Sequence, residues 1–188
     1  MLRSFWITYL FSFIPVTSIA QESPSKRSTV PLTRDRIAIY KTFLTDWQAG
    51  SESPLNVANA TDPFLPERDE LQGCMKGFSK RNRAIATHQF SNEFADDRIR
   101  LLDPAYYKPP TMSDLMSQKH DLDNAVDAAV KTGLMSLSEI IFNHEHQLAA
   151  FQFSFQCGRL CGNGGTVIYE RRNGQWRHSK RRCGSWVS

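Results

Sequence analysis

Residues 149–156 alternate strictly along the chain, and this stretch constrains the fold more than any other. One set of alternating positions holds Ala149, Phe151, Phe153 and Phe155, and the other holds Ala150, Gln152, Ser154 and Gln156. A period of two predicts a half-buried β-strand with an aromatic inner face. Cys157 continues the phenylalanine face, so we expect its sulfur to point inward.

The neighbouring segments extend this strand into a meander. Residues 138–142 predict a short apolar strand, and residues 166–171 predict another. Asn173-Gly174 is a strong signal for a type I′ hairpin, with residues 175–182 as the returning strand. Such short direct connections allow only antiparallel neighbours.

The first half of the chain predicts helices instead. A helix between Thr33 and Gly50 has one apolar stripe, formed by Ile37, Tyr40, Phe43, Leu44 and Trp47. A second helix, between Asp121 and Gly133, carries Leu122, Ala125, Val126, Ala129 and Val130 on one face. Residues 51–66 contain three prolines and are expected to run extended over the surface.

Together these patterns predict an α+β fold, with N-terminal helices packed on a C-terminal curved antiparallel sheet. Cone-shaped folds of the nuclear-transport-factor-2-like (NTF2-like) kind have the same order of elements, an analogy at the level of architecture. We expect residues 33–188 to form a single domain.

The N-terminus has the features of a secretory signal peptide. Arg3 precedes an apolar run over residues 5–16, and Ser18-Ile19-Ala20 offers small residues for cleavage after Ala20. Residues 21–32 are rich in Ser, Pro, Lys and Arg, and we expect them to form a flexible leader. The sequence predicts no transmembrane segment in the mature chain, which we expect to be secreted or periplasmic.

Four cysteines in an exported chain favour disulfides over free thiols. Of the three possible pairings, we favour a local Cys157–Cys161 bond and a long-range Cys74–Cys183 bond. A redox centre is the alternative, but the C-x-x-x-C spacing between strands differs from the C-x-x-C spacing of thioredoxin-like sites. The four glycines of residues 158–165 are expected to supply positive φ angles in a tight turn held by the local disulfide.

No cofactor or metal site is predicted. His144 and His146 are weak metal candidates, because residues two apart in a strand face the same side. Their position in a turn, without further ligands at suitable spacing, favours a solvated segment. His88 is isolated in the sequence and is expected to be structural or exposed.

A basic cluster near the C-terminus could attract an anionic polymer or the surface of the cell envelope. It consists of Arg171, Arg172, Arg177, Lys180, Arg181 and Arg182. Trp176 and Trp186 lie close in sequence and could stack on a ligand ring. Equally, exposed Arg and Lys protect a hairpin edge against aggregation. No sequence feature indicates specific nucleic-acid recognition.

The segments CGRLCGNGG, NGQW and CGSWVS resemble the C-termini of uncharacterised secreted bacterial proteins of the Acidobacteria type. Their pattern is CGxLCGxGG, then GxW, then WxS, and the resemblance is specific to about the last third of the chain. It implies export and no particular activity.

The function expected from the sequence is an exported binding or structural module without enzymatic activity. The alternative is a small enzyme with an acid–base site in the concave face of the sheet, using His178 or Glu170. A deep pocket with converging polar groups would favour the enzyme, whereas a fully packed face of Phe151, Phe153 and Phe155 would favour the module.

Overall fold

The computed structural model describes residues 32–79, 84–91, 94–119, 121–158 and 161–188. The predicted signal peptide and residues 21–31 of the predicted leader lie outside these ranges. None of the described helices is long and apolar enough to cross a membrane.

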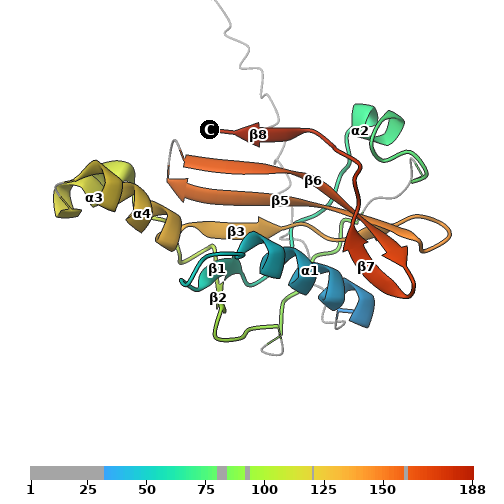
Figure 1. Cartoon of the computed structure of the whole chain (residues 1–188), viewed down its shortest axis with the longest axis horizontal. Helices are drawn as coiled ribbons and strands as arrows, with labels where there is room; N and C mark the ends of the chain where they lie inside the picture. Colours follow the sequence, from blue (N-terminus) through green and yellow to red (C-terminus); the bar gives the residue numbers. More distant parts are fainter. Residues whose placement is uncertain (1–31, 80–83, 92–93, 120, 159–160) are drawn as a thin grey trace, which may run out of the picture.

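Helices and strands follow one another in mixed order along the described chain (Figure 1). The helices are α1 (Arg34–Trp47), α2 (Arg68–Gln72), α3 (Met112–Lys119) and α4 (Leu122–Thr132). The strands are β1 (Leu55–Ala58), β2 (Ile99–Leu102), β3 (Leu134–Leu137), β4 (Ile141–Phe142), β5 (Leu148–Gly158), β6 (Cys161–Arg172), β7 (Gln175–His178) and β8 (Ser185–Val187).

The described strands form one curled sheet in the order β2-β1-β3-β5-β6-β7, with β4 added beside β5 and β8 beside β6. The C-terminal strands are antiparallel, so the predicted meander and the α+β class with a curved sheet are confirmed. The whole sheet is mixed, because β1 runs parallel to both β2 and β3.

Strand β1 corrects the expectation that residues 51–66 cross the surface. All four of its residues are buried between β2 and β3. Its parallel partners are distant in sequence, since Leu55 pairs with Ile99 and Asn56 pairs with Leu134. A four-residue strand with such partners has no local periodicity that a sequence pattern could reveal.

Two further segments differ from the sequence prediction. Residues 138–142 do not form one strand, because Ser138 and Glu139 leave the sheet path between β3 and β4 to pair with Asp62. The glycine-rich residues 162–165 lie inside β6 rather than in a turn, and among the loop glycines only Gly158 has a positive φ, of 142°. The expected role of those strand glycines is therefore wrong.

Helix α1 covers one face of the sheet through the aromatic side chains that the sequence predicted to be inward. Phe151 is fully buried and its ring lies 5.3 Å from those of both Tyr40 and Phe43, measured between centroids. Phe153 and Phe155 pack against Trp47 at 5.3 and 5.7 Å. This face of β5 is therefore packed against α1, with Phe151 and Phe155 buried and Phe153 partly buried.

Helix α4 uses only part of its predicted stripe. Ala125 and Ala129 are fully buried, whereas the larger Leu122, Val126 and Val130 are between 41 and 58 % exposed. The helix ends directly over β5, where a Cβ atom at Gly133 would lie 2.2 Å from Cζ of Phe155. Only glycine permits this approach.

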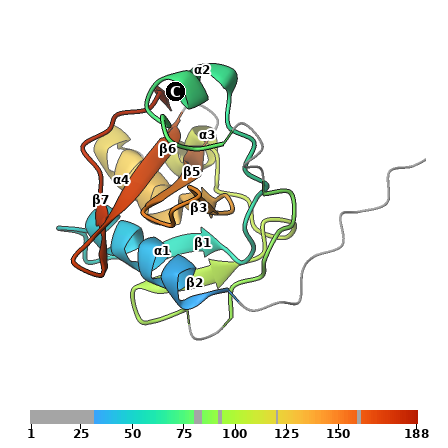
Figure 2. The same ribbon diagram turned by 90° about the vertical axis from the view of Figure 1, so that its right-hand side faces the viewer.

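The opposite face of the sheet is covered by α2 and the segments beside it. In Figure 2, α1 lies below β3, β5 and β6, and α2 lies above them. Phe64, Met75 and Phe78 form a second, smaller core against Ile141, Ala150 and Ile168. The disulfide Cys74–Cys183 joins this cover to the segment before β8. Helix α2 and the segments beside it cover only one end of this face of the sheet.

Candidate functional site

A polar cleft of about 500 Å³ opens on the part of this face that α2 leaves uncovered. Its floor comes from β3, β5 and β6, and its walls come from α2, the segment at Asp62 and strand β8. The lining residues are Asp62, Pro63, Glu67, Glu70, Ser136, Ser138, Gln152, Phe153, Ser154, Gly165, Thr166, Gly184, Ser185 and Trp186.

Strand register brings the floor residues together. Ser136 is opposite Ser154, Ser154 is opposite Gly164, and Gly164 is opposite Trp186. Residues directly opposite each other in an antiparallel sheet share a face. The small polar residues that alternate with the apolar residues of β3 and β5 thus form one continuous surface.

A second row lies beside the first. Gln152 is opposite Thr166. The Ser138 hydroxyl accepts a hydrogen bond from the backbone N–H of Gln152 at 2.7 Å and donates to the carbonyl of Glu139 at 3.1 Å. Two adjacent rows of short polar side chains therefore form the floor, and its second row is fixed by local hydrogen bonds.

Trp186 forms an aromatic wall, and its side chain is 44 % exposed. Its indole lies over the glycine positions of β6, where a Cβ atom at Gly164 would stand 2.6 Å from Nε1. One face of the indole ring therefore lies against the backbone of β6. The absence of side chains at the glycines, rather than a positive φ, explains the glycine run in β6.

Carboxylates line the opposite wall. Glu70 receives a hydrogen bond from the Thr166 hydroxyl and another, at 3.0 Å, from the backbone N–H of Glu67. Glu67 caps the first turn of α2 in return. Asp62 lies at the exposed rim, where partial burial of its carboxyl raises its pKa. Asp62 is therefore a cleft carboxyl whose raised pKa has burial as its cause.

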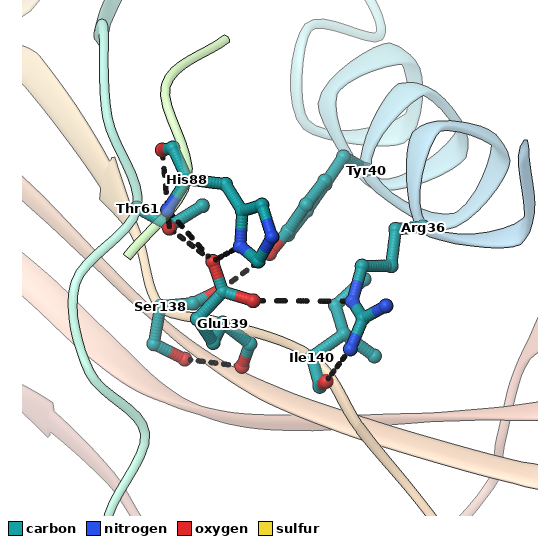
Figure 3. A network of polar contacts seen from close by, with 7 residues as sticks. All are labelled: Arg36, Tyr40, Thr61, His88, Ser138, Glu139 and Ile140. Carbon is teal, nitrogen blue, oxygen red and sulfur yellow. Dashed lines mark hydrogen bonds and ion pairs between the residues drawn. The ribbon is translucent and has the colours of Figure 1, made fainter. Parts of the chain in front are cut away.

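A buried carboxylate anchors this wall from the other side of the backbone (Figure 3). Oε1 of Glu139, whose side chain is 1 % exposed, lies 2.7 Å from Nδ1 of His88 and 3.1 Å from its backbone nitrogen. The Thr61 hydroxyl donates to the same oxygen. His88 is thus structural, one of the two outcomes expected from the sequence.

The same network reaches helix α1. Arg36 places Nε 3.8 Å from Oε2 of Glu139, and its terminal nitrogen donates to the carbonyl of Ile140 at 3.3 Å. The Tyr40 hydroxyl donates to the carbonyl of Ser138 at 2.6 Å (Figure 3). Burial, and after it the charge of Glu139, raises the pKa of Tyr40 well above its usual value.

The network determines where two cleft residues lie. The backbone N–H of Asp62 donates to Leu137 at 2.9 Å, and that of Glu139 donates to Asp62 at 2.7 Å. Thr61 and Glu139 are thereby held inside while their neighbours Asp62 and Ser138 line the cleft. Glu139 does not line the cleft. Its role is therefore structural: it holds the backbone on the acidic side of the cleft in place.

The two disulfides join the cysteines in the pairing favoured from the sequence. Cys157 and Cys161 close the β5–β6 turn, and Cys74–Cys183 links the segment after α2 to the segment before β8. The second bond therefore ties together the acidic wall and the Trp186 wall of the cleft. Arg181 reinforces this link, since its guanidinium donates to the carbonyl of Lys76 at 2.6 Å.

The basic cluster is divided among different partners. Arg171 lies 3.8 Å from Asp35, and Arg172 lies 2.6 Å from Glu170. Trp176 is only 7 % exposed and packs near Phe142, so its ring is not available to stack on a ligand. That part of the sequence prediction is wrong, because the alternation of β7 places Trp176 toward the core. Arg177, Lys180 and Arg182 remain exposed.

The two histidine candidates for a metal site are in different surroundings. His144 is exposed, whereas the ring of His146 stacks on Phe142 at 4.1 Å and its Nε2 lies 3.1 Å from Asp35. Burial raises the pKa of Asp35, but contacts with Trp176 and His146 and the charge of Arg171 outweigh it, so the pKa is lowered. In the described part of the chain, no three potential metal-binding side chains come together.

A second cleft, of about 450 Å³, lies beside the Cys157–Cys161 disulfide and is mainly apolar. Trp47, Leu55, Val130, Phe155 and Val187 contribute to its lining. The residues proposed for acid–base catalysis from the sequence, Glu170 and His178, line neither this cleft nor the polar one.

Comparison with known proteins found no match, either to a protein-family model, to a curated protein or to a solved structure.

Proposed function

We propose that this protein is an exported, disulfide-stabilised binding module whose ligand site is the polar cleft. The observation that carries the proposal is that the two faces of the sheet differ in what lies against them. The aromatic face of β5 is packed against α1, whereas the polar face carries a cleft lined by small polar groups and one seated tryptophan. A solvated sheet face is commonly polar, but here α2, the segment at Asp62 and β8 stand around the polar residues and make this part of the face a cleft.

Export is supported by the N-terminal sequence pattern, by the two disulfides and by the resemblance of the C-terminus to secreted bacterial proteins. Disulfides persist in oxidising compartments, and here one of them ties two cleft walls together. We therefore expect the protein to bind its ligand outside the cytoplasm.

A library of small molecules screened by NMR tests the proposed function, with chemical-shift changes mapped onto the assigned backbone. Ligands of a binding module should shift the amides of Ser154, Thr166 and Trp186. Hits that cluster in the apolar cleft at Trp47 and Val130, or at the exposed Arg177 and Lys180, would contradict the assignment of the site.

The alternative is a small enzyme, and one observation favours it. Burial raises the pKa of Asp62 at the rim of the cleft, a property that general acids share. Prolonged incubation of a cleft ligand with the protein, followed by mass spectrometry, distinguishes the two functions. Unchanged ligand supports the binding module, whereas turnover that Asp62→Asn abolishes would establish the enzyme.

A further inference from the structure

We propose that the cleft binds a carbohydrate, an oligosaccharide that is neutral or carries amino groups, with one sugar ring on Trp186. This inference rests on the proposed function and names its ligand class. Sugars combine apolar C–H faces with a periphery of hydroxyl groups. A matching site therefore needs a flat apolar platform beside several short hydrogen-bonding groups.

Trp186 supplies the platform. Its indole is supported from beneath by the backbone of β6, because Gly162 and Gly164 have no side chains to lift the ring. The ring stands at the cleft wall with 44 % of the residue exposed. A rigid aromatic ring with an apolar face and one polar N–H suits a ligand that is apolar on one side and polar at its edge.

The floor supplies the hydrogen bonds. Ser136, Gln152 and Ser154 each offer both donors and acceptors, as sugar hydroxyls do. Within the described ranges, their side chains have no hydrogen-bond partner from the protein. An apolar ligand would cover these groups and leave them unsatisfied, which is costly.

Charge narrows the class of carbohydrate. The cleft wall carries the carboxylates of Asp62, Glu67 and Glu70, and no Lys, Arg or His is among the described residues that line the cleft. The exposed Arg68, next to Glu67 in sequence, and the exposed Arg182, two residues before Gly184, are not among the described lining residues. Like charges repel at short range, so polyanionic sugars such as heparin are disfavoured and protonated amino groups are favoured.

Isothermal titration calorimetry of the exported protein tests the inference with four probes. These are the cellulose tetramer, the N-acetylglucosamine tetramer, the glucosamine tetramer and a heparin tetrasaccharide. We expect at least one of the first three to bind and heparin not to compete for its site. Asp62→Asn should weaken binding of the glucosamine tetramer specifically, because it removes the carboxylate that faces the amino groups.

The decisive variant is Trp186→Ala, with Val187→Ala as its control. Val187 is the next residue on the same strand, is 84 % exposed and does not line the polar cleft. We expect Trp186→Ala to weaken binding by about tenfold, the scale of losing one stacked ring, and Val187→Ala to leave it unchanged. Ser154→Val keeps the tryptophan but removes a floor hydroxyl, and it should weaken binding even if the alanine variant folds poorly.

Three results would overturn the inference. These are the failure of all three non-anionic probes to bind, undiminished binding by both Trp186→Ala and Ser154→Val, and displacement of a bound probe by heparin. Failure of every sugar while other molecules in the NMR screen still map to the cleft would remove the carbohydrate and leave the proposed function standing.

Discussion

The indole of Trp186 lies so close over Gly164 that a Cβ atom at Gly164 would stand 2.6 Å from Nε1 of the indole. The two residues are opposite each other in the register of β6 and β8. The same Cβ atom would lie 2.7 Å from the carbonyl oxygen of Phe153, so a methyl group at Gly164 must displace the ring together with its strand or shift the backbone of β5. The indole of Trp186 therefore rests on the glycine residues of β6. Trp186 is the only aromatic residue of β8.

Gly164→Ala is expected to lower the free energy of unfolding by about 1 to 3 kcal/mol, the usual cost of overpacking. Gly184→Ala is the matched control, because a Cβ atom at Gly184 meets nothing within 4 Å. Urea denaturation followed by circular dichroism measures both. Equal stability of the two variants would show that the ring does not rest on Gly164.

Glu139→Ala should be among the most destabilising single substitutions. It leaves His88 and Thr61 without the carboxylate oxygen that they share, and it removes the negative charge that faces Arg36. Breaking a buried ion pair by removing one partner costs about 3 to 5 kcal/mol. The exposed Glu145 offers a control, since Glu145→Ala removes a carboxylate from a turn. A loss for Glu139→Ala no larger than that of this control, by urea denaturation, would contradict the anchor role.

The two disulfides should differ in their contribution to stability. Cys74–Cys183 spans 109 residues and Cys157–Cys161 spans four. Loop-closure entropy assigns about 5 kcal/mol to the first and about 2 kcal/mol to the second. We therefore expect the double alanine variant of Cys74 and Cys183 to unfold at a lower urea concentration than that of Cys157 and Cys161. The reverse order would show that the long-range bond adds little beyond the packing around it.

Tyr40 should make the protein sensitive to alkaline pH. Its pKa is raised above the usual value of 10.0, first by burial and then by the charge of Glu139. A group with a raised folded-state pKa contributes stability below its unfolded pKa and loses that stability as pH rises. Unfolding free energies should therefore fall above about pH 10.

Tyr40→Phe provides the comparison for this pH dependence. We expect the variant to be less stable at neutral pH, because the carbonyl of Ser138 loses its donor. Its stability should nevertheless fall less steeply above pH 10 than that of the unchanged protein. Parallel pH profiles for the two proteins would show that Tyr40 does not titrate on unfolding in this range.

The helical stripe, the antiparallel meander and the disulfide pairing could be predicted because each depends on nearby residues or on simple elimination. The Ile37-to-Trp47 spacing and the Phe151-to-Phe155 alternation are local patterns. Strand β1 could not be predicted this way. It is four residues long and is stabilised by parallel partners that lie more than 40 residues away in the sequence.

The candidate site was only partly visible in the sequence. The polar positions of β5, Gln152 and Ser154, belonged to the predicted alternation, but their importance depends on Ser136 lying opposite Ser154 across β3. Register between strands is a tertiary property. Trp186 was named as a possible stacking residue, whereas Trp176 was wrongly given the same role. A single aromatic in a short strand has no sequence signal for the face it occupies.

Glu139 was also missed, because a lone acidic residue in an apolar stretch carries no motif. A signal did exist, since a charged residue among Leu137, Ile140 and Ile141 must be paired if the segment is buried. Its partners Arg36, Thr61 and His88 come from three distant segments. The sequence could have indicated the need for partners without naming them.

A crystal structure with the tightest-binding tetrasaccharide tests the central claim most directly, through the position of the sugar rings. The account predicts one ring stacked on the exposed face of Trp186, with hydroxyl groups within hydrogen-bond distance of Ser154 and Gln152. Sugar density in the apolar cleft at Trp47, or against the exposed Arg177 and Lys180, would contradict it.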